Sequence, residues 1–181
     1  MNPDAVPTID REAIAQEMDD ALAQLRALLD GADAADLHRR SDGTRWSNEQ
    51  LLFHMVFGYL VVRTLLPLVR TLSRLPAPVG RGFAGLLDAA HRPFHVVNYC
   101  GSVVGARVFN HARMGALCGR TIAALQALLR REGEAALHRG MPFPTRWDPY
   151  FTAYMTVAEV YRYPNRHFEH HRRQLTLTSR A

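Results

Sequence analysis

Lysine is absent from this sequence of 181 residues, so all 22 basic side chains are arginines. The net charge is +5 and is unevenly distributed. Residues 1–36 hold nine acids against Arg11 and Arg26, whereas residues 50–131 hold ten arginines and a single acid, Asp88. We interpret this asymmetry as an acidic first element packed on a basic remainder. Nucleic-acid binding is disfavoured, because neither a helix-turn-helix pattern nor aromatic residues interleaved with the arginines accompany the charge.

Cysteine is scarce as well. The chain has two, Cys100 and Cys118, which are too few for a disulfide framework and too far apart for a Cys-x-x-Cys motif. This usage is typical of a protein from a reducing compartment, and we expect a cytoplasmic location. A nucleophilic role for Cys100 is less favoured than that of a buried, unreactive thiol.

Long uninterrupted apolar runs are also missing. The most apolar stretch, residues 51–69, contains His54, Arg63 and Pro67, and it falls short of the roughly 20 apolar residues that a membrane span requires. We therefore predict a helix buried in a protein core and no membrane partner. The first seven residues show no basic region followed by an apolar run, so the sequence predicts no signal peptide.

No stretch of the chain alternates apolar and polar residues as a half-buried strand does, whereas the helical period recurs four times. The four predicted long helices cover residues 9–31, 47–72, 106–131 and 156–177. Between the second and the third, residues 76–105 read as a long irregular insert, with one short helix around residues 83–91. The pattern predicts an all-α four-helix bundle in a single domain spanning residues 1–181.

Capping boxes mark two of the predicted helix starts. Ser47 and Gln50 form one box before the second helix, and Thr156 and Glu159 form another before the last. The last helix has a second candidate start, because Asp148–Pro149 places a cap residue before a proline suited to the first helical position. The sequence leaves both starts open.

The second helix is predicted to face the core with a stripe that contains one histidine. The residues of this stripe share one face of the helix: Leu51, His54, Phe57, Gly58, Val61, Leu65, Leu68 and Leu72. A neutral imidazole buried among them without a partner costs about 1–3 kcal/mol, so both ring nitrogens of His54 need partners. A core histidine bonded to a backbone carbonyl satisfies this need as well as a metal ligand does.

Three of the nine histidines lie within residues 167–171. On a helix, His167 and His171 share one face with Cβ atoms roughly 5–6 Å apart, close enough for both to bind one divalent ion. His170 turns about 60° the other way, towards Arg166 and Arg173, so we predict His167 and His171 as the inward pair. A surface histidine cluster on a basic helix explains the spacing equally well, and a third ligand from elsewhere is needed to decide.

Three features occur together: Trp46 with a capping box before the second helix, His54 within that helix, and His167-x-x-x-His171-x-x-Gln174 on the last. This combination resembles the DinB-like superfamily of bacterial four-helix proteins, over roughly residues 8–178. The resemblance implies an up-down-down-up bundle in which His54, His167 and His171 hold a divalent metal, usually zinc or nickel. It also implies a small-molecule substrate, since characterised relatives are metal-dependent transferases or isomerases that use a low-molecular-weight thiol such as mycothiol or bacillithiol.

No acidic residue stands out from the sequence as a catalytic base. Glu169 points about 200° of helical turn away from His167, and Glu49 and Glu159 are cap residues, so activation of a nucleophile would fall to the metal. We expect arginines of residues 76–105 to line the mouth of the cavity. The leading hypothesis is a metal-dependent enzyme that transfers a thiol or hydrolyses a small substrate. The alternative is a non-catalytic metal-binding stress-response module; nucleic acid is not an expected partner, and a homodimer is left open.

Overall fold

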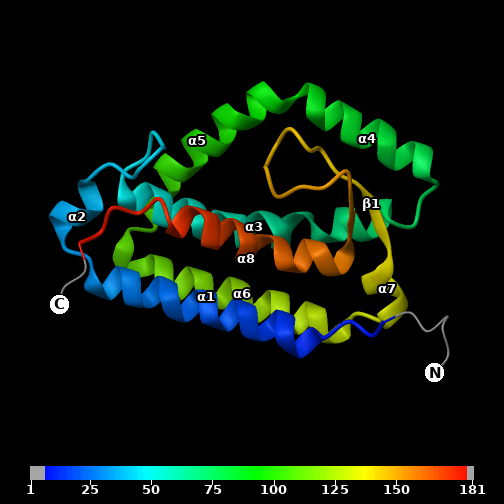
Figure 1. Cartoon of the computed structure of the whole chain (residues 1–181), viewed down its shortest axis with the longest axis horizontal. Helices are drawn as coiled ribbons and strands as arrows, with labels where there is room; N and C mark the ends of the chain where they lie inside the picture. The colour runs from blue at the N-terminus through cyan, green and yellow to red at the C-terminus, as the bar shows by residue number, and fades with distance from the viewer. Residues whose placement is uncertain (1–6, 179–181) are drawn as a thin grey trace.

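The computed structural model describes residues 7–178 and is built almost entirely of helices (Figure 1). Four long helices form the bundle: α1 (Arg11–Gly31), α3 (Asn48–Leu72), α6 (His111–Arg131) and α8 (Val157–Arg172). α1 and α8 run in one direction and α3 and α6 in the other (Figure 1). The all-α class and the up-down-down-up order are therefore as predicted. The first six residues, for which the sequence predicts no signal peptide, lie outside the described residues.

The helix starts follow the capping signals. The Ser47 side chain accepts a hydrogen bond from Gln50 N at the start of α3, and both halves of that capping box are present. Thr156 and Glu159 form the second box, so α8 begins at Val157 and the alternative start at Asp148–Pro149 is not used. Asp148 instead lies in a turn of the loop that precedes α8.

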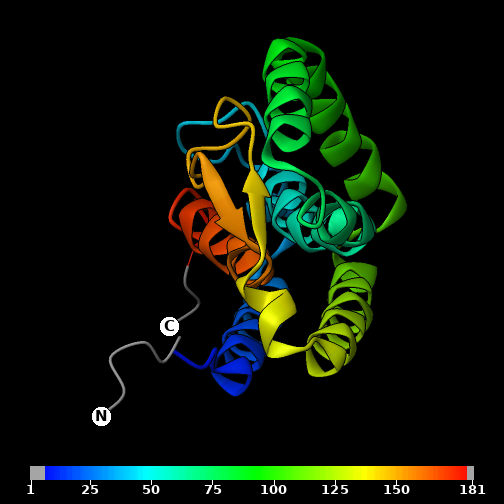
Figure 2. The same cartoon turned by 90° about the vertical axis from the view of Figure 1, so that its right-hand side faces the viewer.

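The prediction of an irregular insert at residues 76–105 is wrong. This segment forms α4 (Ala77–Ala89) and the first part of α5 (His91–Val108), which together arch over α3 and α8 on the side opposite α1 and α6 (Figures 1 and 2). The arch carries the chain back along the bundle, so that α6 can run parallel to α3. Because α5 ends at Val108, the third bundle helix begins at His111 and not at residue 106.

The prolines and glycines of this segment explain the error. Pro78 and Pro93 lie in the first turns of α4 and α5, where backbone N–H groups have no partner within the helix and a proline does no harm. Gly105 lies where α5 crosses α3, and a Cβ there would overlap the ring of Phe53. These residues therefore mark helix starts and a close helix crossing, whereas in the sequence they resemble breaks.

A small antiparallel ribbon joins the arch to the bundle. Its strands, β1 (Gly140–Pro142) and β2 (Tyr154–Thr156), pair with Met141 opposite Met155. No strand was predicted, and three-residue strands are too short for an alternating pattern to appear. Two single-turn helices complete the described chain: α2 (Ala34–His38) and α7 (Glu134–His138). The loop between β1 and β2 lies in the space under the arch (Figure 1).

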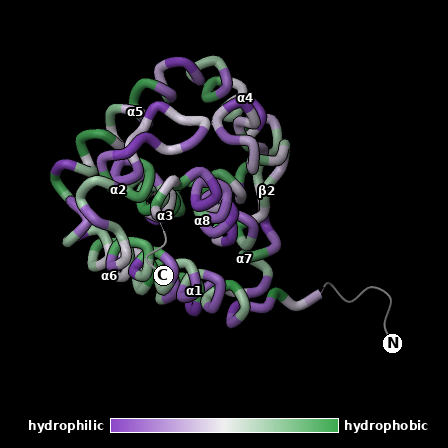
Figure 3. Tube along the Cα trace, turned by 60° about the vertical axis from the view of Figure 1, so that its left-hand side comes forward, coloured by the Kyte–Doolittle hydropathy of each residue, from purple (hydrophilic) through white to green (hydrophobic). Residues whose placement is uncertain are grey.

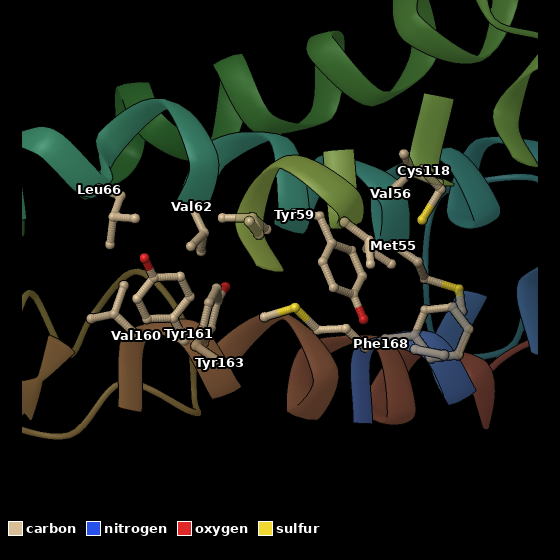
Figure 4. Close-up of a cluster of buried hydrophobic side chains, with 14 of the residues drawn as sticks. Met55, Val56, Tyr59, Val62, Leu66, Cys118, Val160, Tyr161, Tyr163 and Phe168 are labelled. Atoms are coloured by element: carbon tan, nitrogen blue, oxygen red, sulfur yellow. The ribbon is translucent and has the colours of Figure 1, made fainter. Parts of the chain in front are cut away.

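The bundle core lies between α3 and its neighbours. Met55, Tyr59, Val62 and Leu66 of α3 point towards buried side chains of α8 (Figure 4). α3 is the one helix of the described chain long and apolar enough to cross a membrane, but more than half of its apolar window is buried inside the protein. This agrees with the predicted core helix.

The predicted inner stripe of α3 is correct only in part. Its first and last members, Leu51 and Leu72, are buried, but Leu65 and Leu68 are 42% and 41% exposed. Whereas α3 has exposed apolar residues, α8 has a buried polar one: the helix is mainly hydrophilic (Figure 3), but its His167 is buried against α3. The exposed leucines of α3 and the histidines of α8 border the same cavity.

Candidate metal centre

Three histidines from two helices converge where α3 packs against α8. His54 comes from α3, and His167 and His171 come from successive turns of α8. One ring nitrogen from each lies within 4.8 Å of the others. His170 points elsewhere, with its Nδ1 3.1 Å from the hydroxyl of Tyr150. The structure thus brings together the three residues predicted as ligands, and His170, although its ring lies beside that of His171, is not part of the converging group.

A hydrogen bond orients His54 through Nδ1, the ring nitrogen that points away from the other two histidines. Its Nδ1 lies 3.0 Å from Ser102 Oγ, and the Ser102 hydroxyl donates to the backbone oxygen of Asn98 at 2.8 Å. Because that hydroxyl has a single proton, Ser102 Oγ accepts from His54 Nδ1–H, and Nε2 carries the free lone pair. Trp46 stacks on the same imidazole, with ring centroids 4.3 Å apart.

His171 is oriented in the same way from its own helix end. Its Nδ1 lies 2.6 Å from Gln174 Oε1, and since an amide oxygen only accepts, Nδ1 carries the proton. Such outer partners set the tautomer and direction of metal-binding histidines in proteins. Gln174 was part of the sequence pattern, whereas Ser102 was not recognised because its helix was assigned to an irregular insert.

His167 is the most enclosed of the three. Its ring lies against Gly58 of α3, where a Cβ would come within 3.0 Å of Nδ1. That Nδ1 is buried and has no hydrogen-bond partner. An unpaired polar atom in a buried position is unfavourable, so it identifies a place where a further group, such as a cation, would be stabilising.

Burial keeps the three rings neutral. Burial, with a smaller contribution from repulsion by a protonated His171, lowers the pKa of His54 to about 3. Burial likewise places the pKa of His167 well below its usual value, with added repulsion from the neighbouring histidines. The pKa of His171 is also lowered, again chiefly by burial. Neutral imidazole is the form that binds metals, so near pH 7 no proton has to be removed first.

Asp148 is the carboxylate nearest to this cluster. Its Oδ2 lies 3.8 Å from His167 Nε2 and accepts a hydrogen bond from the Tyr163 hydroxyl at 2.9 Å. Its Oδ1 accepts from Tyr150 N at 2.8 Å. In the sequence this residue was considered only as a possible helix cap. The signal that could have revealed it is its isolation, because it is the only acid between Glu134 and Glu159.

An apolar cavity of about 360 Å³ opens from the histidines into the space under the arch. Its volume lies within the range of about 300–1,000 Å³ typical of small-molecule sites. The apolar part of its wall comes from α3, the arch and the β1–β2 region: Phe57, Val61, Leu65, Leu68, Leu72, Phe83, Leu87, Phe94, Met141, Phe143 and Phe151. The exposed leucines of α3 are therefore cavity wall.

The prediction that arginines of residues 76–105 line the cavity mouth is wrong. Among residues 7–178, no arginine contributes to the lining of the apolar cavity. Arg81 and Arg92, the arginines of the segment, are exposed. The arch contributes Phe83, Leu87 and Phe94 to the wall instead.

A second, polar cavity adjoins the first and reaches His171, but neither His54 nor His167 lines it. It has a volume of about 500 Å³ and shares Trp46, His95, Asn98 and His171 with the apolar one. Its remaining wall includes Thr44, Arg45, Tyr99 and Gln174. The Arg45 guanidinium lies over the Tyr99 ring, 4.6 Å from its centroid. An anionic group would find a positive charge here, whereas the apolar cavity offers none of this kind.

The residues present fit a divalent ion. Three neutral imidazoles with converging nitrogens form a donor set suited to zinc, nickel and related ions. Two outer nitrogens are held by hydrogen bonds, and the third ring has an unpaired buried nitrogen. The cluster could therefore hold a metal ion, and three protein ligands would leave a position for a further one on the cavity side.

Comparison with known proteins gives one result. No curated protein and no solved structure matches the chain significantly. A family model described as the DinB superfamily matches residues 17–175, which includes all three histidines and most of the described chain. The chain therefore belongs to the DinB superfamily.

Proposed function

We propose that the protein is a metal-dependent enzyme that transfers a low-molecular-weight thiol to, or hydrolyses, a small electrophilic molecule. His54, His167 and His171 hold one divalent ion in this proposal, zinc or nickel. The observation that carries it is the convergence of three neutral imidazoles, two buried and one partly buried, at the inner end of a cavity. Within this cluster, the buried Nδ1 of His167 has no hydrogen-bond partner, which is costly unless a further group binds there.

A divalent ion bound by three neutral ligands keeps its full charge and lowers the pKa of a thiol or water towards neutrality. The protein's own groups orient and shield the site. Ser102 and Gln174 hold the rings of His54 and His171 in one tautomer, and Trp46 covers the face of His54. The Asp148 carboxylate beside His167 adds a negative charge that favours a cation in the site.

The reaction in this proposal is a displacement. The thiol proton leaves to solvent, the sulfur forms a bond to an electrophilic carbon, and the leaving group departs with its electron pair. A hydrolase would use water in place of the thiol. The thiol version is supported by the polar cavity, whose Arg45 and Gln174 suit a hydrophilic, anionic thiol next to His171.

A cytoplasmic location belongs to the same proposal, since low-molecular-weight thiols are kept reduced there. Cys100 and Cys118 are both unpaired. Cys118 is buried, and burial raises the pKa of its thiol to about 12, so it is unreactive at neutral pH. The exposed Cys100 does not line either of the two cavities at the histidines.

Metal content tests the ligand set. Protein purified without an affinity tag should contain about one divalent ion per chain, as expected for a three-ligand site. His54→Ala, His167→Ala and His171→Ala should each remove most of it. His170→Ala is the matched control on the same helix, and it should retain the metal because His170 faces Tyr150. Equal losses for His170→Ala and His171→Ala would contradict the assignment.

Turnover tests the reaction. Metal-loaded protein is assayed with mycothiol or bacillithiol against a panel of electrophiles, beside a thiol-free reaction and the His167→Ala variant. Activity that requires both metal and thiol supports the transferase. Metal-dependent hydrolysis without thiol supports the hydrolase. Metal binding with no turnover across the panel would overturn the enzymatic proposal in favour of a non-catalytic metal-binding module.

A further inference from the structure

The apolar cavity carries information about its ligand beyond the chemistry at the histidines. Asp148 is the only acid in its lining, and no arginine of residues 7–178 contributes. A negatively charged ligand placed along this wall would lose its hydration without gaining an arginine partner, and a positively charged one would find only Asp148, at the histidine end. An uncharged ligand would lose no hydration of a charged group and would displace water from apolar surface.

The shape of the wall adds a second constraint. The apolar side chains of α3 that line it run from Phe57 to Leu72, a span of about 22 Å at the rise of an α-helix. Leu65 and Leu68 in the middle of this span are 42% and 41% exposed. A helix face of this length, facing a cavity and not a neighbouring helix, suits an elongated molecule that lies along it.

Aromatic side chains close the opposite wall. Trp147 stacks on Phe94 with ring centroids 3.8 Å apart, and its Nε1 donates to the backbone oxygen of Leu87 at 2.6 Å. These contacts tie the β1–β2 loop to both helices of the arch. The Trp147 N–H is therefore already used, and the wall offers a ligand mainly flat apolar surfaces.

We propose that the apolar cavity binds the electrophilic substrate, an uncharged, elongated apolar molecule whose reactive carbon lies at the histidine end. The identity of the reaction rests on the proposed function, but the binding does not. The hydrophilic thiol occupies the polar cavity beside Arg45, so the two reactants lie in adjoining cavities that share Trp46 and His171. The new sulfur–carbon bond forms where the cavities meet, at Trp46 and His171.

Tryptophan fluorescence tests the binding without any need for turnover. The chain has two tryptophans, and both line the apolar cavity, so their emission reports its occupancy. The probes are neutral n-alkyl alcohols, from butanol to decanol, and n-alkyl sulfonates of matching length, added to the protein as purified and again after chelation of the metal. Alcohol affinity should rise about fourfold per methylene until the cavity is full. Sulfonates of the same length should bind at least tenfold more weakly.

A pair of variants separates the cavity from other apolar surface. Leu65→Asp places a charge in the wall and should weaken decanol binding at least tenfold. Leu86→Asp is the control, because Leu86 is an exposed leucine on α4 that does not line the cavity, and its decanol affinity should stay within twofold of wild type. Leu68→Asp repeats the test should Leu65→Asp not fold by circular dichroism.

The outcomes distinguish this inference from the proposed function. Chain-length-dependent alcohol binding without any turnover supports the cavity assignment while overturning the enzymatic proposal. Thiol transfer to small polar electrophiles, with alcohol affinity independent of chain length, overturns the cavity assignment alone. Sulfonates that bind as tightly as alcohols, or equal losses for Leu65→Asp and Leu86→Asp, also overturn it.

Discussion

Ser102 offers the sharpest test of how the histidines are held, since it lies on the arch and 48 positions from its partner His54 in the sequence. Ser102→Ala removes the hydroxyl that donates to Asn98 O and accepts from His54 Nδ1–H. The first loss costs about 0.5–1.5 kcal/mol of stability, and the second leaves a buried N–H unpaired at about 1–3 kcal/mol. The sum is about 1.5–4.5 kcal/mol, and the contact that sets the ring's tautomer is lost as well.

The expected effect on the metal is separate from that on stability. Outer partners of metal-binding histidines contribute about 10- to 100-fold to affinity, which is about 1.4–2.8 kcal/mol. Competition with a chromogenic chelator at pH 7.5 measures the metal affinity of Ser102→Ala, and urea denaturation measures its free energy of unfolding.

Thr121→Val provides the matched control. Thr121 is a fully buried hydroxyl on α6 whose Oγ1 donates to the backbone oxygen four residues earlier, as in Ser102, but it lies outside the histidine cluster. The variant should lose about 1 kcal/mol of stability and keep the metal affinity of the wild type. Unchanged metal affinity in Ser102→Ala, with loss of the metal in His54→Ala, would refute the role assigned to the serine.

Further predictions concern the helix contact, acid stability and nucleic acid. Gly58→Ala should lower metal affinity at least tenfold, because its Cβ would come within 3.0 Å of His167 Nδ1; Gly85→Ala, which meets nothing within 4 Å, should leave affinity unchanged and gain up to about 1 kcal/mol in helix stability. Metal-free protein should show a constant free energy of unfolding above pH 6.5 and lose stability as the pH falls from about 6.5 towards 3. The reason is that His54 takes up a proton near pH 6.5 in the unfolded state but only near pH 3 in the folded state. A free energy of unfolding in urea that stays constant over this range would contradict the pKa shift. Duplex DNA should bind weakly, without sequence preference and with a steep loss in salt, and tight selective binding in a mobility-shift assay at physiological salt would contradict the interpretation of the arginine excess.

Local signals in the sequence predicted the bundle and the histidine cluster well. Both capping boxes, Ser47–Gln50 and Thr156–Glu159, act on backbone groups within one turn, so they operate whatever the rest of the chain does. The i, i+4 spacing of His167 and His171 is equally local. These features require no knowledge of tertiary contacts, which is why they could be derived from the chain alone.

The arch and its contributions to the site could not be derived in this way. Proline and glycine in residues 76–105 have two meanings, as breaks or as helix starts and close crossings, and only the position of Phe53 on another helix distinguishes them for Gly105. With the arch unrecognised, Ser102 had no predicted place near His54. Asp148 was hidden for a related reason, since the loop that brings it to His167 is positioned by contacts with the arch.

The partial error on α3 has a more general physical cause. Hydrophobic periodicity detects a face that avoids charge, and both a packed core and the wall of an apolar cavity meet that condition. On α3 the two faces lie side by side: Tyr59 and Leu66 are fully buried in the bundle, whereas Leu65 and Leu68 remain accessible beneath the arch. Nearly the whole circumference of the helix is therefore apolar, which is why it also resembles a membrane span. The middle of the second apolar face, at Leu65 and Leu68, lines the cavity beneath the arch and is not packed in the core, so its apolar composition is the one expected if the proposed apolar substrate binds there.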